Sequence, residues 1–253
     1  MALLATRTTT LGDGDATAVR YETGAESEWR PLYRIAGVAS LMVAAFIAIQ
    51  TFVFLAWPPP STVSEAFRQL HQNPVLGLLD QDLLMVADYV VLIPVFLALY
   101  LLLRRVSPAF MTLGLVIALV GTAIYITSLT PFNMLMLSSQ YAAATTDAQR
   151  STLLAAGQAT LTTYSGTAYD VGYVMVGGAW LIFTLTALRS SVIGPRTAWV
   201  GVVMAALMTV PANVGTVGLV IAMLSLIPGL VWFVLIARKF FQLGGGTAFG
   251  PGR

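Results

Sequence analysis

The chain has 253 residues, of which 57% are hydrophobic and only 9% are charged, and its mean hydropathy is +0.82. Because soluble domains carry about 25% charged residues, this composition is typical of a membrane protein. The net charge of +2 is too small to indicate nucleic-acid binding, and the absence of cysteine excludes disulfides and thiolate chemistry. The single histidine, His71, excludes multi-histidine metal sites and bis-histidine haem.

Both ends of the chain are predicted to be tails. Residues 1–30 are polar, mixed in charge and rich in threonine and glycine, which is typical of disorder. Their opening apolar run is too short for a signal peptide. We therefore expect a disordered cytoplasmic tail over 1–30, a membrane domain over 31–242, and a flexible glycine-rich tail over 243–253.

Six apolar runs of about twenty residues predict an all-α bundle of six membrane-spanning helices. The fifth run is the shortest because Pro211 and Gly215 interrupt it. In the second and sixth runs, a proline lies ten residues before an arginine, which predicts two bends at a common depth. The runs are Tyr33–Trp57, Leu79–Leu103, Ala109–Leu129, Tyr169–Leu188, Ala198–Val214 and Val217–Ala237.

The basic residues predict how these helices are oriented. Eleven of the thirteen lie on one side, before the first span, between spans two and three, between spans four and five, or after span six. Only Arg68 and Arg150 lie on the other side. The positive-inside rule then places both termini in the cytoplasm, as expected for a multi-pass protein of a cell inner membrane.

The two outer loops contain helix signals. Thr62-Val63-Ser64-Glu65 has the capping-box pattern and precedes a predicted short helix, Ala66–Gln72. Thr146-Asp147-Ala148-Gln149 has the same pattern and begins a helix that runs to about Thr163, while Pro131–Leu137 is expected to extend the third span outward. We expect two short interfacial helices over the outer mouth of the bundle; the simpler alternative is that both loops only seal it.

Six polar side chains from the predicted spans fall in one layer of the bilayer. Counted from the cytoplasmic arginine of each span at about 1.5 Å per residue, all lie roughly 24–30 Å from the inner face. Because an isolated polar group in hydrocarbon is costly, we expect them to line a hydrated, ligand-binding pocket open to the outer side. The alternative is a structural network in which Asp88 is neutral or bonded to Gln50 or a tyrosine. The six are Gln50, Asp88, Tyr125, Asp170, Tyr173 and Asn213.

The sequence contains no motif that is diagnostic of a reaction type: it has no glycine-rich phosphate loop, no HExxH and no GxSxG pattern. No cofactor and no metal site is expected. Asp88 and Asp170 are the candidate catalytic residues, as a general acid and base, because burial changes the proton affinity of a carboxyl group.

Four segments carry a resemblance to a known family. They are Arg34-Ile35-Ala36-Gly37, Asp88–Arg104, Leu137–Arg150 and Leu226–Trp232. Together they resemble a bacterial family of six-span membrane proteins, the domain of unknown function numbered 4386. The resemblance covers about Tyr33 to Phe241, and Tyr141–Thr146 is its most specific part. It implies a bacterial six-span inner-membrane protein and carries no activity that could be transferred to particular residues.

Three functions remain open from the sequence. The first is a membrane protein that binds a lipid or other apolar molecule with a polar head in the outward pocket. The second is a membrane enzyme that acts on a lipid or isoprenoid, using Asp88 with Asp170 or a tyrosine. The third is an accessory subunit of a larger membrane complex, or a homo-oligomer. No nucleic-acid partner is expected.

Overall fold

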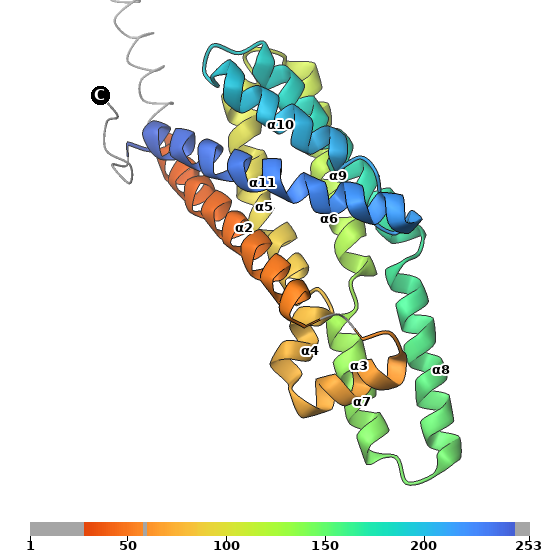
Figure 1. The fold of residues 1–253 in the computed structure, drawn as a ribbon. Helices are drawn as coiled ribbons and strands as arrows, with labels where there is room; N and C mark the ends of the chain where they lie inside the picture. Colours follow the sequence, from red (N-terminus) through yellow and green to blue (C-terminus); the bar gives the residue numbers. More distant parts are fainter. Residues whose placement is uncertain (1–27, 58–59, 246–253) are drawn as a thin grey trace, which may run out of the picture.

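The computed structural model describes residues 28–57 and 60–245 (Figure 1). This part of the chain is all-helical and contains no β-strand. The predicted tails, 1–30 and 243–253, lie almost wholly outside the described residues. The helices are α2 (Arg30–Ala56), α3 (Val63–Gln72), α4 (Pro74–Asp80), α5 (Leu83–Leu103), α6 (Pro108–Ser128), α7 (Pro131–Ala143), α8 (Asp147–Tyr164), α9 (Thr167–Leu188), α10 (Pro195–Leu207) and α11 (Gly215–Leu243).

Proline and threonine set many of the helix starts. A proline stands in the first turn of α2, α4, α6, α7 and α10, where its missing N–H costs no hydrogen bond. The predicted capping box at Thr146 is present in full and begins α8. At α3 only half of the predicted box forms: Thr62 accepts the N–H of Glu65, but the Glu65 carboxylate accepts the N–H of Ser61 instead.

The helices form two parts. Figure 1 shows α2, α5, α6, α9, α10 and α11 packed alongside one another, with α3, α4, α7 and α8 at one end. We call α3, α4, α7 and α8 the cap, and the end of the bundle that they cover the cap end. Helices α7 and α8 lie side by side and extend beyond the bundle in line with α6 and α9 (Figure 1). The start of α2 and the end of α11 meet at the opposite end, where Arg34 Nε donates to the Gly244 carbonyl at 2.7 Å.

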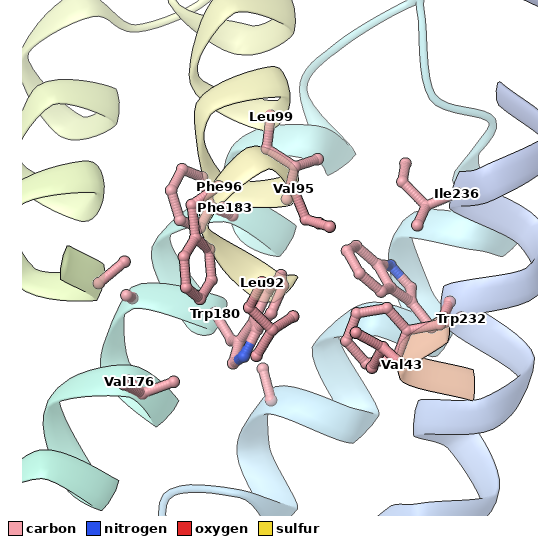
Figure 2. Packing of buried hydrophobic residues seen from close by; sticks show 14 of the residues in the cluster. Val43, Leu92, Val95, Phe96, Leu99, Val176, Trp180, Phe183, Trp232 and Ile236 are labelled. Atoms are coloured by element: carbon pink, nitrogen blue, oxygen red, sulfur yellow. The ribbon is translucent and has the colours of Figure 1, made fainter. Parts of the chain in front are cut away.

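Aromatic rings fill the centre of the bundle (Figure 2). Trp180 of α9 is fully buried and contacts Phe96 of α5 at 4.8 Å and Trp232 of α11 at 5.1 Å between ring centroids. Phe96 also stacks on Phe183 at 5.9 Å. Each such pair contributes about 0.5–1.5 kcal/mol beyond the burial of its area, so this cluster joins α5, α9 and α11 into one body.

The cap has a small core of its own. Phe67 and Leu70 of α3 are buried against Met134 of α7. The Ser138 hydroxyl of α7 donates to the Phe67 carbonyl at 2.7 Å, and a Cβ added at Gly157 of α8 would lie 2.7 Å from the Phe67 ring. Helix α3 is therefore held tightly between α7 and α8.

A helix lies at each of the six predicted positions, and the bounds differ most for the second, fifth and sixth. In the described part of the chain, five helical stretches are long and apolar enough to cross a membrane: α2, α5, α6 with α7, α8 with α9, and α11. The predicted fifth span, Ala198–Val214, is wrong in its second half, because α10 ends at Leu207. Pro211 lacks the N–H that would continue the helix. A Cβ at Gly177 of α9 would lie 2.6 Å from the Met208 carbonyl oxygen, so the non-helical segment after α10 packs closely on α9.

The predicted loop helices are present, with two differences. Helix α3 contains the predicted Ala66–Gln72, and α8 ends within one residue of the predicted Thr163. The predicted second span begins too early at Leu79, because Pro74–Asp80 forms the separate helix α4. The predicted extension at Pro131 is a separate helix, α7, because Leu129 and Thr130 are not helical and separate it from α6.

Candidate functional site

Tyrosine rings fill the bundle at its cap end. Tyr125 of α6 stacks on Tyr89 of α5 with 4.3 Å between ring centroids. It also contacts Tyr169 and Tyr173 of α9 at 5.1 and 6.2 Å. Tyr164, the last residue of α8, contacts Tyr169 at 5.6 Å. We call these five residues, which come from four helices, the tyrosine cluster.

A glycine on α9 permits this packing. A Cβ added at Gly172 would lie 2.6 Å from the backbone nitrogen of Tyr125, a distance that no side chain tolerates. Without a side chain at Gly172, the backbones of α6 and α9 can approach closely. Since Gly172 lies between Tyr169 and Tyr173 in the sequence, this approach brings both of their rings against Tyr125.

The turn between α4 and α5 borders the cluster and carries two acids. Asp82 has φ of 60° and ψ of 33°, a left-handed conformation that residues other than glycine rarely adopt. The Tyr164 hydroxyl donates a hydrogen bond to the Asp82 carboxylate. Burial raises the pKa of Asp82 from 3.8 to about 6; the bond from Tyr164 opposes this shift, and the nearby Asp80 adds to it.

Side chains from three other helices hold this turn. Gln50 of α2 donates from Nε2 to the Leu79 carbonyl at 3.2 Å, and the Gln69 amide of α3 donates to the Asp80 carboxylate. Tyr164 of α8 supplies the third bond, to Asp82. Burial raises the pKa of Asp80, and the bond from Gln69 opposes that shift. Unusual backbone conformations persist where the surroundings fix them in this way, and they are concentrated at functional sites.

Four buried amide and carboxyl oxygens in this region have no hydrogen-bond partner within residues 28–57 and 60–245. They are Gln50 Oε1, Asp80 Oδ1, Asp88 Oδ1 and Asp170 Oδ1, and we call them the open acceptors. Gln50 and Asp80 meet at the α4–α5 turn, while Asp88 and Asp170 each adjoin a tyrosine of the cluster in sequence. Leaving a buried acceptor unpaired costs about 1–3 kcal/mol, so four in one region require an explanation.

The structure places all six predicted site residues toward the cap end, but not in one set of contacts. Tyr125 and Tyr173 belong to the tyrosine cluster, and Asp88 and Asp170 are open acceptors beside it. Gln50 bonds to the α4–α5 turn. Asn213 lies apart: it is exposed, and its Nδ2 donates to the Ser165 carbonyl between α8 and α9 at 3.2 Å.

Several residues of the site were missed by sequence reasoning. Asp80 and Asp82 were not among the predicted site residues, although both lie at the start of the predicted second span, Leu79–Leu103. Gln69 and Tyr164 reach them from other helices, which no local pattern indicates. The recurrence of tyrosine at 164, 169 and 173, at the start of the fourth span, was the signal that could have indicated the cluster.

Two grooves on the surface lie away from this region. One, of about 570 Å³, lies at the tip of the cap between Gln140 of α7 and Leu153 of α8. The other, of about 600 Å³, is apolar and lies between Trp199 of α10 and Pro228 of α11. None of the six predicted site residues lines either groove. Across the described parts of the chain, no group of three His, Asp or Glu side chains could hold a metal ion.

Chemically, this region can accept hydrogen bonds and positive charge. No family model, curated protein or solved structure matches the chain. The resemblance to the bacterial six-span family therefore stays a prediction, and the site has to be interpreted from its own residues.

Proposed function

We propose that this membrane protein binds a lipid, or another apolar molecule with a polar head, at the cap end of its bundle. The observation that carries the proposal is the set of open acceptors beside the tyrosine cluster. A polar head would supply the hydrogen bonds that residues 28–57 and 60–245 do not. The tails would lie along apolar helix faces beside the acids, where Val90 of α5 is 52% exposed and Val171 of α9 is 42% exposed.

The proposal includes six membrane crossings, with α10 and the segment 208–214 as the fifth. Two contacts support this count. Asn213, after α10, bonds to Ser165 at the cap end, although α10 begins just after the opposite end of α9. Arg34 of α2 bonds to Gly244 after α11, so the chain enters and leaves the bundle at the same end, as an even number of crossings requires.

The proposal also places the cap on the outer side of a bacterial inner membrane, with both termini in the cytoplasm. Its support is the clustering of Lys and Arg at the end opposite the cap. Large apolar side chains on the cap are exposed, including Val75 at 69%, Phe132 at 59% and Met136 at 61%. Such side chains suit contact with the interfacial region of a bilayer, which fits the predicted interfacial helices.

Native mass spectrometry of the full chain, purified in a mild detergent, tests the proposal. We expect the wild type to retain a bound species of lipid mass, and Asp88→Asn and Asp170→Asn to lose it. Asp147→Asn is the matched control, because Asp147 lies at the exposed start of α8 and should leave binding unchanged. A wild type without bound lipid, or equal retention by all four proteins, would contradict the proposed function.

A further inference from the structure

We propose that the polar head bound at the cap end carries a protonated amine, held by Asp88 and Asp170, and is not an anion. This inference rests on the lipid-binding function proposed above and names the chemical class of the ligand. Its starting point is the chemistry of the four open acceptors.

The open acceptors are all oxygens of amide or carboxyl groups. An amide oxygen only accepts hydrogen bonds, and so does a carboxyl group that is ionised by pairing with a cation, so a cationic ligand that satisfies them has to donate. A primary ammonium group brings three N–H donors and a positive charge, whereas a phosphate brings further acceptors. An anionic head has no positive charge to pair with Asp88 and Asp170, and it would add like-charge repulsion where they are ionised.

The open acceptors at the α4–α5 turn also require a hydrogen-bond donor. Gln50 is 8% exposed and Asp80 is 6% exposed, so both side chains are more than nine-tenths buried. Gln50 uses its only donor group on the Leu79 carbonyl, which leaves its amide oxygen beside the turn. Gln69 bonds one carboxylate oxygen of Asp80, and Oδ1 stays open. The same need for a donor thus arises at a second, independent place.

The charges of the cap end favour a cation. Its acids are Glu65, Asp80, Asp82, Asp88, Asp147 and Asp170. Within the described ranges, its basic side chains are Arg68, His71 and Arg150, and none of them faces the cluster. Arg68 and His71 are exposed on α3, and Arg150 bonds Asp147 and the Ala144 carbonyl at the far tip of the cap.

The tyrosine cluster adds an attraction of its own. The face of an aromatic ring carries partial negative charge and attracts ammonium groups. Tyr89 follows Asp88 and Tyr169 precedes Asp170, so each of the two acids adjoins a ring of the cluster. Acids and ring faces together form the kind of surface that binds amines.

The test compares lipids that differ only in the head. The full chain in detergent is offered phosphatidylethanolamine, its N-acetylated form and phosphatidylglycerol, all with the same acyl chains, and bound lipid is measured by native mass spectrometry. We expect about tenfold tighter binding of phosphatidylethanolamine than of either other lipid. This preference should disappear in Asp88→Asn and Asp170→Asn and persist in Asp147→Asn.

Each of the other possible outcomes would contradict one specific claim of the proposal. Equal binding of the three lipids, or a preference for phosphatidylglycerol, would overturn the amine proposal and leave lipid binding standing. No binding of any lipid would overturn the proposed function itself. A preference that survives both substitutions would overturn the assignment to Asp88 and Asp170. Thermal unfolding of each variant shows whether it is folded, and the wild-type comparison of the three heads holds even if a variant is not.

Discussion

The hydroxyl of Tyr164, at the end of α8, donates a hydrogen bond to Asp82, which lies 82 positions earlier in the turn before α5. This bond joins the cap to the bundle at the point where the backbone of Asp82 is left-handed. It also positions Tyr164 against Tyr169, and hence the start of α9 against α6. The conformation of one turn and the packing of the tyrosine cluster therefore depend on each other.

The first prediction concerns Asp82. Asparagine also tolerates the left-handed region and can accept the bond from Tyr164, so Asp82→Asn should stay within about 1 kcal/mol of the wild type. Asp82→Ala loses the bond and keeps the backbone strain, and it should destabilise the protein by about 2–3 kcal/mol. Thermal unfolding in detergent measures both changes.

Tyr164→Phe provides a second arm of the same experiment. It should cost about 1–3 kcal/mol, because it leaves the buried Asp82 without its donor. Combined with Asp82→Ala, it should add little further loss, since both substitutions remove one bond. Fully additive losses would show that Tyr164 and Asp82 stabilise the fold independently.

The second prediction is a pH dependence of stability. The pKa of Asp82 is raised from 3.8 to about 6, so the folded chain holds a proton that the unfolded chain has already released. Its contribution is fully present below pH 3.8 and is lost as the pH rises to about 6, by at most about 3 kcal/mol for a shift of this size. Asp80 acts in the same direction. Unfolding measured between pH 3.5 and 7 should show a shallower fall in Asp82→Asn; identical profiles would contradict the prediction.

The third prediction concerns the close approach of α6 and α9. Gly172→Ala would place a Cβ 2.6 Å from the backbone nitrogen of Tyr125, which cannot move aside as a flexible side chain could. We expect a loss of about 1–3 kcal/mol, typical of overpacking. Gly178→Ala, on the same helix, is the control: nothing lies within 4 Å of its added Cβ, and its stability should be unchanged or higher.

Much of the fold could be predicted because each membrane helix has a local signal in the sequence, a continuous apolar run of about twenty residues. Long apolar runs predicted both ends of α2, α6 and α9 to within three residues, whereas α11 continues six residues past the predicted end at Ala237. The early end of α10 at Leu207 was not predicted, because the close packing of Met208 on Gly177 of α9 is a tertiary contact that hydropathy does not show. The polar layer was predicted only from the position of each residue along its span. This located Tyr125 and Tyr173, but it did not predict that Tyr164 of the cap contacts the same cluster.

The fourth prediction is the topology of the membrane domain. The chain has no cysteine, so single cysteines can be introduced without background. Gln72→Cys on α3 and Val214→Cys before α11 should label from outside the cell, and Ser191→Cys between α9 and α10 only from inside; all three positions are exposed or end a helix. Labelling of Val214→Cys from the cytoplasmic side would show that α10 does not cross.

The last prediction separates stability from function at Asp88. Its Oδ1 is buried without a partner in the part of the chain that the structure describes, so the carboxyl group costs free energy in the folded protein. Asp88→Leu removes that cost and fills the space with an apolar side chain on an apolar helix. We expect it to stabilise the protein by about 1–3 kcal/mol in thermal unfolding while it abolishes lipid retention in native mass spectrometry.

Asp82→Leu is the matched control for this trade-off. It places a branched side chain in a left-handed backbone and removes the acceptor of the Tyr164 bond, so it should destabilise the protein. If Asp88→Leu lowered stability as much as Asp82→Leu, Asp88 would have stabilising contacts and its acid would be structural. If it raised stability and lipid retention persisted, the acid would have no part in binding. Only a gain in stability with a loss of lipid fits an acid kept for its ligand, since residues that bind ligands are retained at the expense of stability.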